Sequence, residues 1–419
     1  MLNESGVREL AYVVKVNAIE PIEGKDRVEC ARVGGWTCMV RKGAFKAGDL
    51  GIYFEIDSLV PVDKDPFKFC EKYKGHIKTQ KFKTPSGQFW SQGLLMPATE
   101  FGGFCYQDGD GQFYLHFDKG SYLNENIDLA EGTFLTEKFG ITYYEVEDVK
   151  RKAKVNPDAK INSAFARHPK IAKKYGRFIK KHKFARWLFL AIFGRKPLPS
   201  WPVEVKKTDE ERIENRPWTL KDTEKLWVAT EKVDGSSSTF HMRRGKGLKK
   251  AQYFVCSRNV VFDNPKAEQR NYYKDTIGNI WQEMSVKYNM EEKLAKLLEQ
   301  RPTAEWVTIQ AETFGAGVQK RDYGMKEHDL RAFNLIFSDC GRVGTLEMKR
   351  ILDAIGIPSV PIISEGMTLP STIEELREFV HSAPSAIDGE MKEGIVFRSL
   401  DGVDSFKCVD PEFLVLYHG

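Results

Sequence analysis

The feature that most constrains the fold is a series of short β-rich runs near the beginning of the chain. The runs are Leu10 to Val16, Val28 to Val33, Thr37 to Val40, Gly51 to Ile56 and, after a basic stretch, Gly93 to Met96. Turn signals such as Gly34-Gly35 separate them. Closely spaced strands without long helical patterns between them predict a small β-barrel, and an OB-like barrel is the version that binds nucleic acid.

The second half of the chain has a different pattern. From Trp201 to Gly419, strand-like runs mix with helical stretches, which predicts an α+β domain large enough to hold an enzyme site. The strand-like runs are Trp227 to Ala229, Phe254 to Cys256, Trp306 to Gln310, Ala332 to Phe337 and Gly394 to Phe397, and the clearest helices are Glu291 to Gln300 and Ile373 to Val380. We therefore expect an OB-like domain over 1–145, a basic helical linker or insertion over 146–200, and a catalytic domain over 201–419.

The predicted linker carries most of the positive charge. Lys150 to Lys196 contains sixteen Lys and Arg residues against one acid, Asp158, so it has a net charge of +15 while the rest of the chain sums to −10. The same segment contains seven apolar residues in a row, Trp187 to Phe193. Three interpretations stay open: a basic arm that contacts RNA, a linker helix docked on its neighbours, or an interfacial membrane helix.

Composition bounds the cellular setting. The seven cysteines are scattered, and none forms a CxxC pair, so neither a disulfide framework nor a zinc site is indicated. The chain starts without a signal sequence, and no apolar run approaches the roughly 20 residues that a membrane span needs. These features predict a cytoplasmic, intracellular protein with reduced thiols.

The chemistry centres on Thr230 to Ser236. Within it a lysine in strand context, Lys232, is followed by Asp234-Gly235, a pair that forces a turn and can present the amine at the mouth of a pocket. Alone this pattern is typical of a surface turn, but five further elements follow in order over about 175 residues. They are Ser257-Arg258-Asn259, Gln310 to Gly315, Ala332-Phe333-Asn334, Lys392 to Phe397, and Ser405-Phe406-Lys407.

In this order the elements resemble the motifs of the covalent nucleotidyltransferase superfamily of polynucleotide ligases and capping enzymes. The finer likeness is to RNA ligases of the Naegleria type, which carry an N-terminal OB domain. It is seen in Lys207 to Asn215, in Lys42-Gly43 with Gly48-Asp49, and in Asp57 to Pro61. The resemblance implies an α+β fold class, with an N-terminal OB-like β-barrel followed by an α+β nucleotidyltransferase domain of the ATP-grasp-like ligase kind.

The resemblance also implies an activity. An ATP-dependent RNA ligase joins 3′-hydroxyl and 5′-phosphate RNA ends, as in RNA repair, through a lysyl-adenylate and then an RNA-adenylate, and nicks in duplexes are the expected substrate. Lys232 is the implied nucleophile. A free lysine has a pKa near ~10.4, so nearby cations and metal are expected to depress the pKa of Lys232. Lys407 and Mg²⁺ are the expected sources of that positive charge.

Each remaining site residue takes its role from the same resemblance. By that resemblance, Glu393 holds the Mg²⁺ (or Mn²⁺) through water, assisted by Asp234 and Glu312. The implied ATP contacts are Glu231 at the adenine edge, Arg258 at ribose or phosphate, Glu312 at a ribose hydroxyl, Phe333 stacked on the adenine, Lys407 at the α-phosphate and Arg212 at the departing pyrophosphate. For six of these residues a plainer role stays open: core packing for Phe333, a surface ion pair for Arg258, turn formation for Asp234, a solvated helix start for Arg212, and a solvated acid for both Glu312 and Glu393.

One departure from the superfamily pattern stands out. The last motif often has two lysines, whereas here Lys407 stands alone with Ser405 before it. Either Lys407 contacts the phosphate by itself, or another cation supplies the missing charge.

Domain order favours an RNA ligase, because DNA ligases and capping enzymes place the OB domain after the catalytic domain. The alternatives are a non-catalytic RNA-binding protein on a ligase scaffold and a GTP-dependent capping-type transferase. The expected partners are RNA and ATP, without a membrane, and the expected state is a monomer. By hypothesis, the OB-like part helps to bind RNA on the 3′-hydroxyl side of a break.

Overall fold

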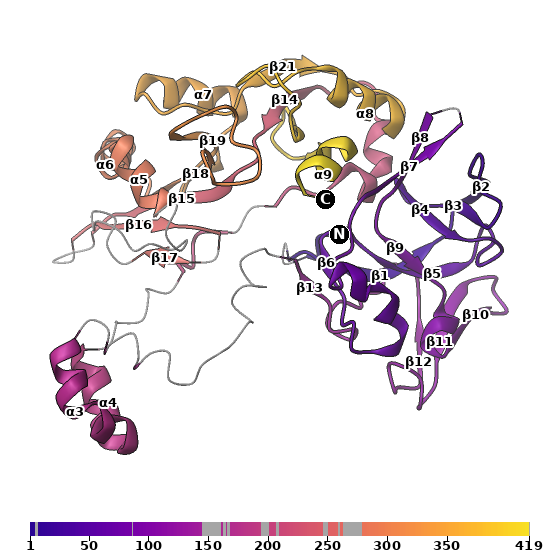
Figure 1. Cartoon of the computed structure of the whole chain (residues 1–419). Coiled ribbons are helices and arrows are strands. Elements are labelled where there is room, and N and C mark those ends of the chain that lie inside the picture. The colour runs from indigo at the N-terminus through magenta and orange to yellow at the C-terminus, as the bar shows by residue number, and fades with distance from the viewer. Residues whose placement is uncertain are drawn as a thin grey trace. The chain divides into compact units, whose positions relative to one another are not determined.

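The computed structural model divides the chain into two compact units. One contains Met1–Tyr143 together with Trp201–Gly419, and the other contains Tyr144–Ser200 (Figure 1). The structure describes residues 1–4, 7–85, 87–144, 161, 165, 168–193, 201–206, 209–245, 250–258, 260–262 and 279–418.

Short antiparallel strands build the N-terminal part of the larger unit. One sheet has the order β1-β5-β9, with β1 at Ala11–Lys15, β5 at Leu50–Phe54 and β9 at Leu94–Met96. A second has the order β2-β3-β4, with β2 at Ala18–Pro21, β3 at Val28–Val33 and β4 at Trp36–Arg41. The other elements are β6 (Ser58–Leu59), η1 (Asp65–Tyr73), β7 (Gln80–Thr84), β8 (Gly87–Ser91), η2 (Ala98–Phe101), β10 (Gly103–Gln107), β11 (Phe113–Phe117), β12 (Ile127–Leu129) and β13 (Thr142–Tyr143). All five strands predicted from the β-rich runs are confirmed.

Side-chain alternation explains how these strands form a core. In β4, Trp36, Cys38 and Val40 are buried, and the residues between them are not. Trp36 packs against Tyr53 of β5 with ring centroids 5.7 Å apart. The strands therefore share an aromatic interior, as the predicted OB-like part requires.

The C-terminal part of the larger unit contains two antiparallel sheets. Four strands are ordered β21-β14-β22-β23, and six are ordered β17-β16-β15-β18-β19-β20. Their bounds are β14 Trp227–Lys232, β15 Ser236–Arg243, β16 Gln252–Cys256, β17 Val261–Phe262, β18 Trp306–Gly315, β19 His328–Phe337, β20 Gly341–Arg342, β21 Ile362–Met367, β22 Gly394–Ser399 and β23 Ser405–Val409. Since β14 ends only four residues before β15 begins, the turn between them joins the two sheets.

Helices cover these sheets. Leu294 of α6 and Trp281 of α5 share a buried cluster with Ile309 of β18, and Leu376 of α8 packs with Trp227 and Phe397 of the smaller sheet. The helices are α5 (Ile280–Lys287), α6 (Met290–Gln300), α7 (Thr345–Ala354), α8 (Ile373–Ser382) and α9 (Pro411–Tyr417), with the 3-10 turns η3 (Ile213–Asn215) and η4 (Pro217–Lys221). The predicted helices correspond to α6 and α8, and the α+β fold class is confirmed.

A buried polar network links the two parts of the larger unit. The amide of Asn215, in η3, donates to the carboxylate of Glu55 over 2.7 Å, and the hydroxyl of Tyr12 donates to the same carboxylate over 2.9 Å. The indole of Trp36 donates to the Asn215 carbonyl oxygen over 2.6 Å. Glu55 is fully buried, so these bonds compensate for its lost hydration.

The smaller unit contains two helices, α3 (Pro169–Lys181) and α4 (Lys183–Phe193). They share a small core of their own, in which Phe189 contacts Ile179 and Phe165. The helical prediction for this segment is confirmed for these residues, while most of 146–167 and 194–200 lies outside the described residues. No helix in the described part of the chain is long and apolar enough to cross a membrane.

Candidate active site

Lys232 is the last residue of β14, and the turn after it is tightly packed. A Cβ at Gly235 would lie 2.4 Å from the carbonyl oxygen of Thr313, so only glycine lets this turn approach β18. The backbone N–H of Asp234 donates to the hydroxyl of Tyr323 over 2.7 Å. The predicted Lys-x-Asp-Gly turn therefore has a rigid setting.

Strand pairing brings three carboxylates to this lysine. Lys232 lies opposite Gly394 in the β14–β22 ladder, which places the neighbouring Glu393 beside it, and the Lys232 Nζ to Glu393 Oε2 distance is 2.6 Å. Glu312, on β18, and Asp234, in the turn, both act electrostatically on the Lys232 amine. The structure thus brings together the predicted nucleophile and all three residues predicted to hold the metal.

These carboxylates control the protonation of the site. Burial by itself lowers the pKa of Lys232, but Glu393, Glu312 and Asp234 more than offset burial and raise that pKa above its ordinary value. Burial, together with the neighbouring carboxylates of Glu393 and Asp234, raises the pKa of Glu312 to about 8 although Lys232 opposes the shift. By itself the protein therefore raises the pKa of Lys232, because its acids outweigh its bases at this point, and the expected lowering by cations together with metal stays a prediction.

Lys407, on β23, belongs to a cluster of cations around one acid. Its Nζ donates to Asp209 over 2.5 Å, and Asp209 also lies 3.5 Å from Arg8 and 3.6 Å from Arg258. Burial, together with the nearby charges of Arg8 and Arg212, lowers the pKa of Lys407 to about 8 although Asp209 opposes the shift. The pKa of Asp209 lies well below its usual range, since its cations outweigh its burial.

Arg212 is buried rather than solvated. Only 4% of it is exposed, and it forms a parallel backbone bridge with Lys407. Its guanidinium lies 3.7 Å from Asp57, while its Nε and Nη1 are buried without a hydrogen-bond partner among the described residues. A solvated helix start is therefore wrong for Arg212. Buried, unpaired guanidinium donors fit an anionic ligand group such as a phosphate.

The structure shows what accompanies the single lysine of the last motif. Ser405 donates its hydroxyl to Glu210, an acid that also pairs with Arg398 at 3.0 Å. Ser405 therefore supplies no positive charge, whereas Arg8 and Arg212 lie close enough to Lys407 to lower its pKa. Arginines from outside the motif thus bring positive charge near Lys407, and whether one of them takes the role of a second lysine stays a prediction.

Phe333 and Glu231 both have protein partners. Phe333 is half-buried and packs in a small cluster with Val233, the residue after the nucleophile. The carboxylate of Glu231 accepts hydrogen bonds from the Ser385 hydroxyl over 2.6 Å and the Ala386 N–H over 2.8 Å. These contacts leave the predicted adenine contacts of both residues as predictions, and they give Glu231 a clear structural task in holding the loop before β22.

Arg258 lies partly in solvent, with 45% of its side chain exposed. Its guanidinium stacks over the ring of Tyr143 at 5.5 Å from the centroid, so an aromatic residue of β13 fixes its position. Its predicted contact with ribose or phosphate stays a prediction. The neighbouring Asn259, which belongs to the same motif, lies outside the described residues.

Several site residues carry no signal in the sequence. Arg8, Tyr143 and His418 are separated from the motifs along the chain and meet them only in the fold. Asp209 lies in the Lys207 to Asn215 run that carries the family likeness, which is the one signal that could have found it. His418 Nε2 lies 3.3 Å from Asp234 Oδ1; burial lowers the pKa of His418, but Asp234 more than offsets this and raises it.

The donor set fits a divalent cation held through water. Among the described residues, no group of three His, Cys, Asp or Glu side chains is arranged as a direct metal site. Oδ2 of Asp234 is nevertheless buried without a hydrogen-bond partner in that part of the chain, and burial beside other carboxylates raises the pKa of the Glu312 carboxyl. Adding positive charge would satisfy both groups, and hard oxygen donors are those that Mg²⁺ and Mn²⁺ prefer.

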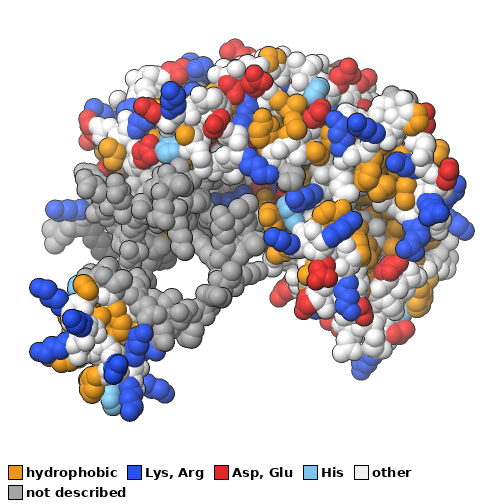
Figure 2. All heavy atoms as spheres, viewed as in Figure 1, with side chains coloured by type: hydrophobic (Ala, Val, Ile, Leu, Met, Phe, Trp, Pro, Cys, Tyr) orange, Lys and Arg blue, Asp and Glu red, His pale blue; other side chains and the backbone are white. Residues whose placement is uncertain are grey.

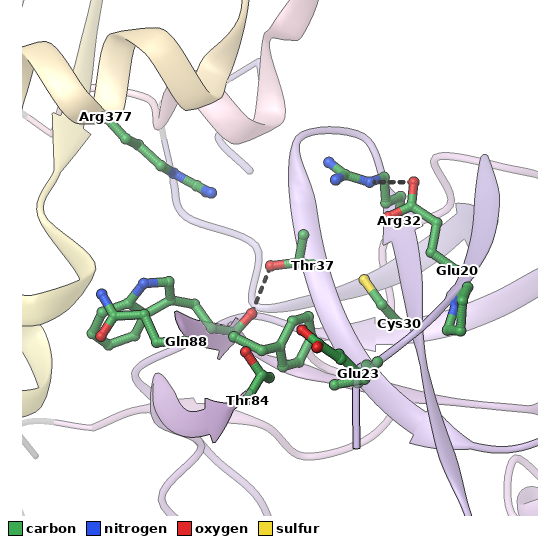
Figure 3. Close-up of a pocket in the computed structure, with 12 residues that line it drawn as sticks. Glu20, Glu23, Cys30, Arg32, Thr37, Thr84, Gln88 and Arg377 are labelled. Carbon is green, nitrogen blue, oxygen red and sulfur yellow. Dashed lines mark hydrogen bonds and ion pairs between the residues drawn. The ribbon is translucent and has the colours of Figure 1, made fainter. Parts of the chain in front are cut away.

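A separate groove lies on the OB-like part (Figure 3). It has a volume of about 340 Å³ and is lined on one side by Arg32 and Glu20, which pair over 2.8 Å, and elsewhere by Trp90 and by Arg377 of α8. None of the predicted site residues lines this groove. The site around Lys232 is therefore distinct from it.

A strand-end lysine among carboxylates, with a cationic cluster beside it, is the arrangement that the resemblance to covalent nucleotidyltransferases predicts. Comparison with family models agrees: residues 225–409 match the RNA ligase family, and residues 10–98 match an OB-fold domain. The C-terminal part of the chain is therefore similar to an RNA ligase domain, and a part similar to an OB-fold domain precedes it.

Comparison with solved structures gives a more specific likeness than the family models do. The chain resembles Naegleria gruberi RNA ligase with pyrophosphate, with 23% identity, a TM-score of 0.67 and coverage of 98% of this chain and 99% of that one. A glutamate-to-alanine variant of the same ligase with ATP and Mn has 23% identity and a TM-score of 0.67, with 98% of this chain and 100% of that one covered. A lysine-to-alanine variant with ATP and Mn has 24% identity and a TM-score of 0.66, with 99% of each chain covered. Comparison with curated protein sequences gives no match. The chain thus has the fold of the Naegleria type RNA ligases, as the sequence resemblance predicts.

Proposed function

We propose that this protein is an ATP-dependent RNA ligase that seals a 3′-hydroxyl to a 5′-phosphate, with nicks in duplex RNA as its substrate. The observation that carries the proposal is the position of the Lys232 amine, 2.6 Å from Glu393 and within the field of Glu312 and Asp234. The RNA ligase match over residues 225–409 and the resemblance to a ligase bound to ATP and Mn support it.

In the first step Lys232 Nζ attacks the α-phosphorus of ATP. A P–N bond forms, the bond between the α-phosphorus and its bridging oxygen breaks, and pyrophosphate leaves. The amine must first lose a proton, which its carboxylates oppose by raising its pKa. A divalent cation bound at Glu393, Asp234 and Glu312 would supply positive charge that lowers the pKa of the amine and stabilises charge on the α-phosphate.

The proposed phosphate contacts are basic residues at and near Lys407. Lys407 is the proposed α-phosphate contact, and Arg212, whose Nε and Nη1 are buried and unpaired among the described residues, is the proposed pyrophosphate contact. In the structure, the carboxylate of Asp209 is an ion-pair partner of both Lys407 and Arg258. Since a carboxylate and a phosphate oxygen accept the same donors, the cluster is built for anions.

Two later steps complete the proposed reaction. The 5′-phosphate of the RNA attacks the lysyl-adenylate, takes the AMP and frees the Lys232 amine. The 3′-hydroxyl then attacks the activated phosphate and AMP leaves. The OB-fold domain, which the Glu55 network joins to the catalytic domain, is the proposed support for the RNA on the 3′-hydroxyl side.

Incubation with ATP labelled at the α-phosphate, with Mg²⁺, and then denaturing electrophoresis tests the first step. We expect a protein-bound label that survives boiling and is absent in Lys232→Ala. Lys349→Ala is the matched control, because Lys349 lies at the surface in an ion pair with Asp353 within α7. Label from GTP and not from ATP would point instead to a capping-type transferase, and no label from either to an RNA-binding protein without this activity.

The substrate needs its own experiment. A panel of nicked duplexes with RNA or DNA on each side of the break, together with single-stranded ends, separates the substrate classes. We expect the fastest sealing for a nick with RNA on the 3′-hydroxyl side. Equal rates on single strands would contradict the nick preference while leaving the ligase activity intact.

A further inference from the structure

The helical hairpin α3–α4 plays no part in the chemistry proposed above, yet its surface has an unusual composition. Residues 169–193 contain eight basic residues and no acid: Lys170, Lys173, Lys174, Arg177, Lys180, Lys181, Lys183 and Arg186. All seven residues of this set from Lys170 to Lys183 are exposed. The hairpin therefore presents a positive surface whose charge is not balanced by acids within it.

Large apolar side chains are exposed on the same hairpin. On α4 they are Phe184 at 73%, Trp187 at 63%, Leu188 at 43% and Ile192 at 62% exposed, and on α3 Tyr175 and Phe178 are also exposed. The α4 residues follow a spacing of three, one and four, so they lie on one face of the helix. Figure 2 shows hydrophobic and basic side chains together on this hairpin.

This apolar face is not the face that holds the hairpin together. Phe189 and Leu190 of α4 pack in the hairpin core with Ile179 of α3, and the Phe189 and Phe193 rings lie 5.0 Å apart. Helix α4 is thus apolar on two sides, one used for the core and one turned to solvent. Exposing a face of this kind is unfavourable, which indicates that something covers it.

We propose that the hairpin binds the surface of an anionic membrane, with the outer face of α4 inserted at the level of the lipid headgroups and the basic residues around it contacting lipid phosphates. An interfacial helix needs aromatic and aliphatic side chains on one face and Lys and Arg beside it, and both are present here. This binding is peripheral, which agrees with the absence of a spanning helix in the described part of the chain.

The composition of the hairpin surface argues against RNA and against a second copy of the hairpin as the partner that covers the apolar face. RNA would use the positive charge and could stack on Trp187, but bases gain little from Leu188 and Ile192 in a continuous aliphatic face. A second copy of the hairpin would bring eight further positive charges against these eight, with no acid in the hairpin to pair them. The acidic remainder of the chain is the third candidate occupant, and it is one outcome of the test below.

Co-sedimentation of the full-length protein with vesicles tests the proposal. We expect binding to vesicles of phosphatidylcholine mixed with phosphatidylserine, at least about tenfold weaker binding to phosphatidylcholine alone, and weakening by added salt. The combined variant Trp187→Ser, Leu188→Ser and Ile192→Ser should reduce binding by at least about tenfold. Val286→Ser with Val403→Ser is the matched control, since both valines are exposed on the catalytic domain.

Two further measurements keep the outcomes distinct. The α4 variant is expected to keep its thermal unfolding temperature and its affinity for nicked duplex RNA, because the replaced side chains contact solvent. If the α4 variant loses affinity for RNA and the unmodified protein does not bind vesicles, the proposal is overturned in favour of an RNA-binding arm. A parent that binds neither vesicles nor RNA through α4 would also overturn it and favour docking on the body of the protein. Vesicle binding and RNA binding do not depend on lysine adenylylation. Failure of the membrane proposal can therefore be distinguished from failure of the proposed ligase activity.

Discussion

Two regions of this molecule are rich in positive charge, and they differ in whether the cations are paired with acids. Around Lys232 and Lys407 the cations are largely buried, and acids such as Glu393 and Asp209 hold them at hydrogen-bond distance. In the α3–α4 hairpin the lysines are exposed, and residues 169–193 contain no acid. Burying a charge is costly unless it is paired, whereas a hydrated charge is tolerated alone. The cations of the site are therefore held in position by their acidic partners, whereas the hairpin has no acids of its own and can bind an external partner.

The largest expected effect lies in the buried network that joins the OB-fold domain to the catalytic domain. Glu55→Ala removes the acceptor of Tyr12 and Asn215 and also the carboxylate 3.0 Å from Arg8, which leaves this arginine with the more distant Asp209 at 3.5 Å. We expect the free energy of unfolding to fall by about 3–5 kcal/mol, measured by denaturant titration. Glu131→Ala, at an exposed position, should change it by less than ~0.5 kcal/mol. A similar small change in Glu55→Ala would show that the network contributes little stability.

The next effect concerns the carboxylate beside the nucleophile. Glu393→Gln keeps the size of the side chain but removes the charge that faces Lys232 and the proposed metal. We expect the rate of lysyl-adenylate formation to fall roughly 100-fold, because several kcal/mol of metal-dependent stabilisation is lost. Single-turnover labelling with ATP measures it. An unchanged rate at saturating Mg²⁺ would exclude Glu393 from metal binding.

Acid should weaken the same buried network that Glu55 anchors. Burial alone would raise the pKa of Glu55, but its partners, Arg8 foremost, lower that pKa to about 2. The unfolded chain binds this proton more tightly, so the stabilisation is fully present above the unfolded pKa of ~4.3 and is lost as pH falls toward 2. We expect this group to cost roughly 2 kcal/mol between pH 6 and pH 3, with the loss absent in Glu55→Ala. Denaturant titrations of both proteins across this range are the measurement.

A smaller effect is expected at Arg212, the proposed pyrophosphate contact. Arg212→Ala removes buried donors that have no partner among the described residues, and we expect the apparent KM for ATP to rise about tenfold. Sealing of an RNA whose 5′ end is already adenylated needs no ATP and should be unchanged. Arg350→Ala, at an exposed residue of α7, is the control. Equal impairment of both reactions would indicate a structural role for Arg212.

The smallest effect should come from the exposed basic region. Lys173→Gln with Lys174→Gln is expected to change the free energy of unfolding by less than ~0.5 kcal/mol, because hydrated surface charges contribute little to folding. Thermal and denaturant unfolding measure it. A destabilisation as large as that of Glu55→Ala would remove the contrast between the two regions.

Much of the site was predictable because its residues are linked by strand order. Lys232 and Glu393 belong to separate motifs, and they meet because β14 and β22 are neighbours in one sheet. Arg212 shows the limit of sequence reasoning. A charge run such as 209–212 is typical of a solvated segment, yet the fold buries this arginine beside Lys407. Neither burial nor pairing between distant segments can be deduced from a local pattern.

The sequence by itself determined the order of domains and the strands and helices with clear periodicity, and it predicted the nucleophile and the metal-binding acids that the fold brings together. Each of these depends on local spacing or on motifs in a fixed order. The tertiary structure decided the protonation of Lys232, the pairing of Lys407 with Asp209 and the contribution of Arg8 from the OB-fold domain. Those properties depend on distances and burial between residues far apart in the chain, because electrostatic energies are set by where charges lie in space and how much water surrounds them.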